Sequence, residues 1–127
     1  MTTLEHNKQT VIDFITQSFN AQQPAAAVAK YVGAEYIQHD PQSADGAEAF
    51  IQMATGFTSH FPQLHIDIKR VLAEGDLVAA HVLITMAPGS PGMAGVEIYR
   101  LQEGKIVEHW NVLQPVPDQA ANDNTMF

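Results

Sequence analysis

Two short segments near the carboxyl end of the chain place acidic, imidazole and amide side chains among apolar residues. Glu97 lies in V-E-I-Y-R, whereas His109 and Asn111 lie in E-H-W-N. A carboxylate beside an imidazole in an apolar pocket can take a proton from a substrate and return it. These residue types therefore predict general acid-base chemistry, provided that the fold brings the two segments together.

The turn between these two segments decides whether Glu97 and His109 share a face. A three-residue loop that ends at Gly104 would place Glu97 opposite His109. One face would then carry Glu97, Tyr99, His109 and Asn111. A two-residue loop would instead group Glu97 with Glu108 and Trp110. We prefer the three-residue loop, because glycine as its last residue supplies a positive φ that a glutamate resists.

Two further histidines are candidates for the same site. His39 precedes Asp40-Pro41 at the end of a short extended arm, where a side chain can point into the mouth of a cavity. His81 lies in the middle of an apolar strand, where a hydrogen-bonded core histidine and a substrate contact both remain open. No histidine pair has the i, i+4 or H-x-H spacing of a local metal site, so we expect no metal.

The amino-terminal half of the chain has the apolar spacing of helices. Recurrence over 4–19 predicts a first helix, and Pro24 suits the start of a second helix that ends near Tyr31. Asp45 is the expected N-cap of a third helix, which Pro62 ends. The apolar face of this third helix includes Phe50, Met53 and Phe57. These side chains are expected mainly to pack in the core and secondarily to line the pocket.

Beyond Pro62 the apolar period changes from 3.6 to two, which is typical of strands. Four strands are expected, at 64–69, 77–86, 96–101 and 105–114, with a Pro- and Gly-rich loop over 87–95 that would form a flap over a cavity. Three helices followed by an antiparallel meander predict an α+β fold, with the helices packed on one face of a curved antiparallel sheet and a conical pocket between them. The last residues, 115–127, have no periodicity and are expected to form an extended tail.

Composition limits the class of protein. The chain has 127 residues, 46% of them apolar, and no cysteine, which suits one domain over 1–127 without disulfides. Fourteen acidic and six basic residues give a net charge of -8, which argues against nucleic acid or an anionic membrane surface as a partner. No apolar run approaches the ~20 residues of a membrane helix, so a cytoplasmic protein is expected.

Three motifs resemble the SnoaL-like polyketide cyclase family. They are Y-I-Q-H-D-P at 36–41, V-E-I-Y-R at 96–100 and G-K-I-V-E-H-W-N-V-L-Q-P-V-P at 104–117. The resemblance covers nearly the whole chain. It implies the cone fold of the nuclear-transport-factor-like group, cofactor-free acid-base chemistry on a carbonyl compound, and a homodimer.

The resemblance also bears on individual positions. Similar proteins usually carry an aspartate where this chain has Asn111, and they often carry an asparagine where it has Asp40. Glu97 matches the strand position of an acidic oxyanion-hole residue in ketosteroid isomerase.

We therefore expect an acid-base enzyme that acts on a small, mostly apolar carbonyl compound by aldol cyclisation, isomerisation or dehydration. Either His109 or Glu97 would be the base, and the other, with Asn111 and His39, would donate hydrogen bonds to the enolate oxygen. Seven side chains are expected to contact the substrate: Tyr36, Asp40, Phe50, Met53, Phe57, His81 and Tyr99. The alternative is a non-catalytic small-molecule-binding domain that kept the cone and lost the acid at position 111.

The opposite face of the sheet is expected to be the outer one. It would carry three large apolar side chains with one ion pair, namely Ile98, Ile106 and Trp110 with Arg100 and Glu108. Such a surface is too apolar to be left exposed, and its charges could set register, so it predicts a homodimer.

Overall fold

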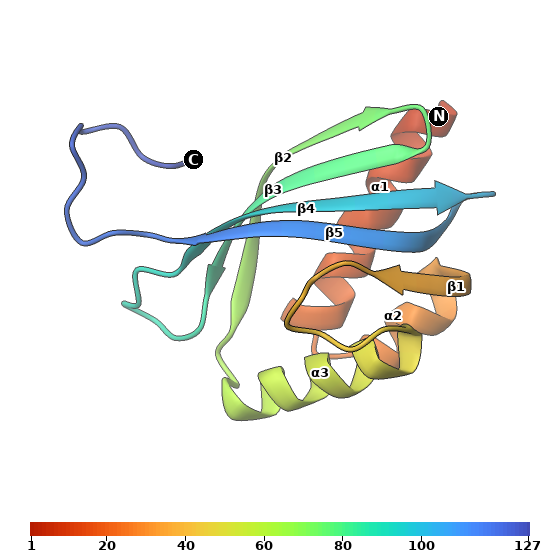
Figure 1. Ribbon diagram of the computed structural model, residues 1–127, viewed down its shortest axis with the longest axis horizontal. Helices are drawn as coiled ribbons and strands as arrows, with labels where there is room; N and C mark the ends of the chain where they lie inside the picture. Colours follow the sequence, from red (N-terminus) through yellow and green to blue (C-terminus); the bar gives the residue numbers. More distant parts are fainter.

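The computed structural model describes residues 1–127 and has three α-helices on one face of a five-stranded sheet (Figure 1). The helices are α1 (Thr3–Ile15), continued by the π-helical turn η1 (Thr16–Asn20), α2 (Pro24–Tyr31) and α3 (Ala47–His60). The strands are β1 (Val32–Gln38), β2 (His65–Glu74), β3 (Leu77–Thr85), β4 (Met93–Gln102) and β5 (Lys105–Pro115). The α+β prediction, with helices on one face of the sheet, is confirmed. No helix is long and apolar enough to cross a membrane.

The sheet has the strand order β1-β5-β4-β3-β2 and is mixed rather than purely antiparallel. The segment expected to be a brief extended arm is strand β1, which pairs in parallel with β5. Parallel neighbours need a long crossover, and here α3 and the other three strands lie between the two in sequence. In this pairing Gln38, the last residue of β1, lies beside His109 on β5.

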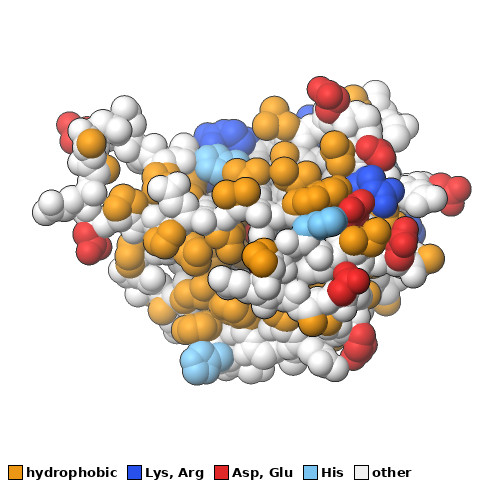
Figure 2. Space-filling model, in the orientation of Figure 1, with side chains coloured by type: hydrophobic (Ala, Val, Ile, Leu, Met, Phe, Trp, Pro, Cys, Tyr) orange, Lys and Arg blue, Asp and Glu red, His pale blue; other side chains and the backbone are white.

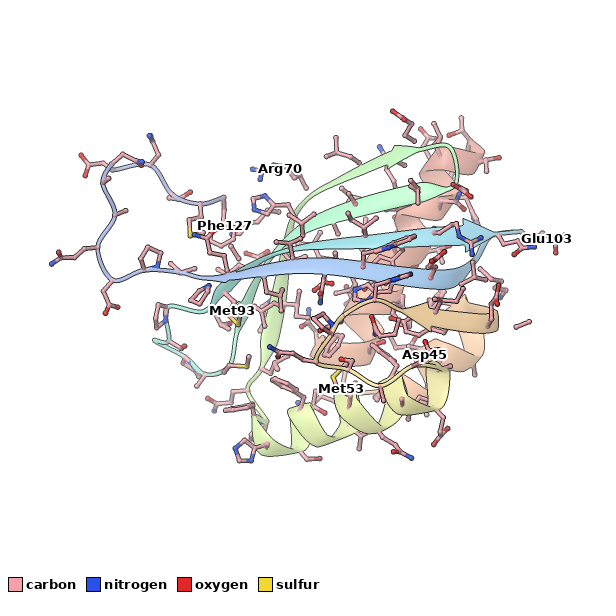
Figure 3. The ribbon with its side chains drawn as sticks, in the orientation of Figure 1. Asp45, Met53, Arg70, Met93, Glu103 and Phe127 are labelled. Carbon is pink, nitrogen blue, oxygen red and sulfur yellow. The ribbon has the colours of Figure 1, made fainter.

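The start of α3 also differs from the prediction. The helix begins after Gly46, which makes no side-chain cap, so Asp45 is not the N-cap. The Asp45 carboxylate instead accepts a hydrogen bond from the backbone N–H of Gln38 at 2.8 Å. Asp45, labelled in Figure 3, therefore ties the end of β1 to the start of α3 and helps to hold Gln38 in place.

The β4–β5 hairpin has a two-residue turn, and the predicted three-residue loop is wrong. Glu103 and Gly104 both have positive φ, as a type I′ turn requires. A register shift between Arg100 and Leu101 then adds one residue to β5. Without that bulge, Glu97 would face Trp110; with it, Glu97 lies opposite Asn111.

The bulge restores the side-chain grouping that the wrong loop predicted. Because side chains alternate along a strand, a shift of one residue changes which set faces inward. Glu97, Tyr99, His109 and Asn111 consequently share the face toward the helices. The same bulge buries Ile106 completely in the core, so this residue is absent from the outer face on which it was expected.

Aromatic rings fill the space between α1, α3 and the sheet. The ring of Phe14 lies 5.1 Å from that of Phe50 and 5.9 Å from that of Tyr99, measured between centroids. Tyr36 packs on Phe50 at 5.7 Å. Tyr36 and Tyr99 are both buried, and burial, with a smaller contribution from the Glu97 charge, raises the pKa of each phenol.

The connection between β3 and β4 is shorter than predicted, because β4 already begins at Met93. Gly92 has a φ of +81°, and a Cβ atom built on it would lie 2.6 Å from the backbone oxygen of Ile84. Gly89 has the same φ but open space around it. Gly92 therefore serves two purposes, since it supplies the left-handed conformation and permits a close approach to β3.

We expect Gly92→Ala to destabilise the protein more than Gly89→Ala. Both variants place a side chain at positive φ, at a cost of ~1–2 kcal/mol, but only Gly92→Ala forces an atom into the backbone of β3, for a further ~1–3 kcal/mol. Urea unfolding of the two variants measures the difference. Equal free energies of unfolding would show that this close approach is absent.

We expect Tyr36 and Tyr99 to keep their protons in alkali for as long as the protein is folded. Above the unfolded pKa of about 10, the unfolded chain releases tyrosine protons that the folded chain retains, so stability falls as pH rises. The tyrosinate absorbance of two of the three tyrosines should therefore appear only on unfolding. Tyr36→Phe is the control and should remove one of these two late signals.

Candidate active site

A cavity of about 240 Å³ lies between the inner face of the sheet, α3 and the end of the first helix. Most of its wall is apolar, with two methionines labelled in Figure 3, Met53 on α3 and Met93 at the start of β4. The remaining apolar lining residues are Ile15, Phe19, Phe50, Phe57, Leu64, Ile66, Ile84, Met86, Tyr99 and Leu113. The polar lining residues are Gln38, Asp40, Gln42, Ser43, Glu97, His109 and Asn111.

A hydrogen-bonded carboxyl and imidazole form the centre of the polar wall. Glu97 Oε2 lies 2.6 Å from His109 Nε2, and the two side chains are 14% and 7% exposed. Since Glu97 lies opposite Asn111, His109 is its diagonal neighbour, within reach of a long side chain. The other carboxyl oxygen, Oε1, has no hydrogen-bond partner in the protein and remains available to a ligand.

The second nitrogen of His109 also has a partner. Nδ1 lies 2.7 Å from Oε1 of Gln38, which the parallel pairing of β1 with β5 brings alongside. The same amide oxygen accepts a hydrogen bond from the backbone N–H of Asp40 at 3.1 Å. The imidazole is thus held at both nitrogens, by one residue on β4 and one on β1.

Tyrosine rings cover the imidazole. The Tyr99 ring centroid lies 4.8 Å from that of His109 at an interplanar angle of 37°, and Tyr36 stacks on it at 6.3 Å. These contacts limit the access of water to His109, and they leave its hydrogen-bonded edge beside the cavity. An electrostatic interaction in such a place is stronger than it would be in water.

A second polar pair lies beside the first. Asn111 Nδ2 donates a hydrogen bond to Asp40 Oδ2 at 3.0 Å, and the backbone N–H of Gln42 donates to Asp40 Oδ1 at 2.9 Å. Both oxygens of the Asp40 carboxyl are therefore engaged. One N–H of the Asn111 amide is free to donate to a molecule in the cavity.

Eight of the eleven site residues named from the sequence line the cavity. They are Asp40, Phe50, Met53, Phe57, Glu97, Tyr99, His109 and Asn111. His39, His81 and Tyr36 do not. Tyr36 lies one layer behind the wall, where it is buried against Phe50 and His109.

His39 lies on the outer face of the sheet. Its ring stacks on that of Trp110 at 4.9 Å, and its Nε2 atom lies 2.7 Å from Oε2 of Glu108. Glu108 also accepts a hydrogen bond from Arg100 at 2.7 Å, and this bond, followed by that of His39, lowers the pKa of the Glu108 carboxyl. The ion pair expected between Arg100 and Glu108 is present, and His39 belongs to it rather than to the cavity.

His81 is also on the outer face, where it contacts Arg70 and stacks on the ring of Phe127 at 5.4 Å. Figure 3 shows Arg70 and Phe127 close together where the tail returns toward β2 and β3. Side chains alternate along β3, so the apolar neighbours Ala80 and Val82 are buried and His81 points away from them.

Gln38, Gln42 and Ser43 line the cavity and were missed from the sequence. A signal for Gln38 was nevertheless present. In an extended segment, alternate residues share a face, so a side chain between Tyr36 and Asp40 at position 38 faces inward with them. The same alternation turns His39 outward.

The family model of the SnoaL-like polyketide cyclases matches residues 9–120. A search of curated proteins found no match to this sequence.

Solved structures resemble the chain closely in fold. A candidate polyketide cyclase from Acidithiobacillus ferrooxidans has a TM-score of 0.71 at 21% identity, with 89% of this chain and 91% of that chain covered. AclR, a candidate hydroxylase from Streptomyces galilaeus, has a TM-score of 0.70 at 20% identity, covering 89% and 81%. An NTF2-like protein of unknown function from Mesorhizobium loti has a TM-score of 0.71 at 22% identity, covering 90% and 95%. The model of the SnoaL-like polyketide cyclase family matches residues 9–120, which is most of the chain, and this protein therefore belongs to that family.

Proposed function

We propose that the protein is a cofactor-independent acid-base enzyme that acts on a small, mostly apolar carbonyl compound. The observation that carries this proposal is the 2.6 Å contact between Glu97 and His109 at the wall of an apolar cavity. A carboxyl and an imidazole in contact, screened from water and open to a ligand at one oxygen, suit proton transfer. The volume of about 240 Å³ lies below the ~300–1,000 Å³ of drug-sized sites, which favours a small substrate.

The reaction would begin at the carbon next to the carbonyl group. The C–H bond breaks, its proton goes to Glu97, and its electron pair moves onto the carbonyl oxygen to give an enolate. The free N–H of Asn111 donates a hydrogen bond to that oxygen, which stabilises the developing charge. Aldol closure, isomerisation or dehydration can each proceed from this enolate, and the family includes members with a polyketide cyclase description.

The amide at position 111 means that another residue must act as the base if the protein is an enzyme. An amide cannot accept a proton at neutral pH, so Asn111 cannot be the base. In the proposed enzyme the base is Glu97, which lies opposite Asn111 on the neighbouring strand β4. If Glu97 cannot serve in this way, the domain would bind small molecules without converting them.

We expect Glu97→Gln to slow α-proton exchange by ~10²–10⁴-fold, because it removes the carboxylate that accepts the proton. The measurement is hydrogen-deuterium exchange at the α-carbon of a panel of small β-keto compounds in D₂O, followed by NMR. His109→Ala should also slow exchange. His109→Asn should do the same, because each variant removes the imidazole that contacts the Glu97 carboxyl at 2.6 Å.

Glu108→Gln is the matched control for this experiment. It makes the same substitution on the neighbouring strand, one residue before His109, but on the outer face of the sheet. Its exchange rate should equal that of the wild type. If no compound exchanges with the wild type while ligands still bind in the cavity, the enzyme hypothesis is wrong and the binding domain replaces it.

We also propose that two copies associate through the outer face of the sheet. This face exposes Leu72 and Val112 at 65% and 70%, with Val96 beside Val112 on the neighbouring strand. Figure 2 shows hydrophobic side chains gathered across the middle of this face, with histidines and charged groups on both sides. An apolar centre with a charged rim is typical of an interface between proteins.

We expect sedimentation at micromolar concentration to give twice the chain mass of 13.9 kDa. Val112→Glu should shift the protein to the monomer, because it places a charge in the centre of the apolar face. Leu4→Glu is the control, since Leu4 is exposed on α1, away from the sheet face. A wild-type protein that sediments only at 13.9 kDa would contradict the dimer.

A further inference from the structure

Gln38 stands between the imidazole of His109 and the backbone of Asp40. We propose that Gln38 is a positioning residue that fixes the tautomer of His109 and so makes Glu97 and His109 share a single proton. The protonation state follows from the contacts of Gln38, His109 and Glu97 alone. Only the role of the shared proton in catalysis rests on the proposed function.

The orientation of the Gln38 amide follows from the backbone. An amide side chain has an oxygen and a nitrogen of similar size, and only its hydrogen-bond partners distinguish them. Here the partner is the backbone N–H of Asp40, 3.1 Å away, which can only donate. The atom that faces it must therefore be the oxygen, Oε1.

The same oxygen determines where His109 carries its proton. Oε1 lies 2.7 Å from His109 Nδ1, and an amide oxygen can only accept. Nδ1 must therefore be the N–H. In the neutral imidazole the other nitrogen, Nε2, then has a lone pair and no proton.

That lone pair would face the Glu97 carboxyl. Nε2 and Glu97 Oε2 are 2.6 Å apart, a distance at which two lone pairs repel. One proton must lie between them, either on Nε2 with a carboxylate or on Oε2 with a neutral imidazole. The pair therefore carries one shared proton and no net charge.

Without the Gln38 acceptor a different state is open to the pair. Neutral His109 could move its single proton to Nε2 and donate it directly to the Glu97 carboxylate. The pair would then hold one proton fewer and carry a net charge of minus one. Gln38 excludes this state, because a bare Nδ1 would face the amide oxygen.

The shared proton affects the chemistry of the cavity. A neutral pair repels an enolate less than a negative pair does, so the enolate forms at a lower cost beside it. When Glu97, as the carboxylate, takes the substrate proton at Oε1, the pair gains one proton beyond the Nδ1 proton and the shared one, and its net charge rises from zero to plus one. Return of one proton to the product restores the starting state, so no external proton is required.

The test is ¹⁵N NMR of the imidazole at neutral pH, which distinguishes a protonated ring nitrogen from a bare one without any substrate. The spectrum of His109→Asn identifies the His109 signals among the six histidines. In the wild type we expect Nδ1 to show the coupling of a directly bonded proton. In Gln38→Leu, which has no acceptor, that coupling should be lost and Nε2 should show the coupling of a directly bonded proton.

Two variants complete the experiment. Gln38→Glu keeps an acceptor at the same place and should retain the proton on Nδ1, whereas a merely structural role for Gln38 predicts no such difference from Gln38→Leu. Gln42→Leu changes another glutamine of the cavity wall, and it should give the wild-type spectrum because the two nitrogens of His109 are bonded to Gln38 and Glu97 instead. If Gln38→Leu does not fold, the wild type and Gln38→Glu still test the proposal, because a bare Nδ1 in either spectrum contradicts it.

A wild-type spectrum with a bare Nδ1 would overturn the inference, as would a Gln38→Leu spectrum identical to that of the wild type. Both outcomes are independent of catalysis. If Nδ1 is protonated as expected but no compound exchanges its α-proton, the proposed function fails while the assignment of Gln38 stands.

Discussion

The hydrogen bond between Glu97 and His109 constrains the rest of the site. A buried imidazole is costly unless both ring nitrogens have hydrogen-bond partners, and a carboxyl in an apolar wall is costly unless it is paired as well. This requirement explains why an edge strand and a neighbouring strand both converge on one ring. β4 supplies the carboxyl, β1 supplies the amide of Gln38, and the two tyrosines exclude water from the imidazole between them.

Two irregular features of the backbone make this convergence possible. The bulge in β5 gives His109 and Asn111 the same face as Glu97, although the hairpin turn alone would have separated them. The parallel pairing of β1 with β5 carries Gln38 to His109, and the bond from Asp45 holds the end of that strand. Bulges are frequent beside functional sites because they redirect side chains without ending the sheet.

The two faces of the sheet divide the chemistry of the chain. Adjacent residues of one strand, Glu108 and His109, point to opposite sides, so one joins the outer ion pair and the other the cavity wall. The same alternation separates His39 from Gln38. One sheet can therefore present the Glu97–His109 pair to the cavity on its inner face and exposed apolar side chains on its outer face.

The sequence by itself determined the helices, four of the five strands and the apolar wall, because these depend on local periodicity. It also named Glu97 and His109, since a carboxylate and an imidazole in apolar strands are unusual enough to stand out. The tertiary structure decided which side chains of the strands face the cavity and which face the outer surface. The extra residue of β5 and the parallel partner of β1 are long-range features with no local period. The first buried Ile106, and the second brought Gln38 to the imidazole.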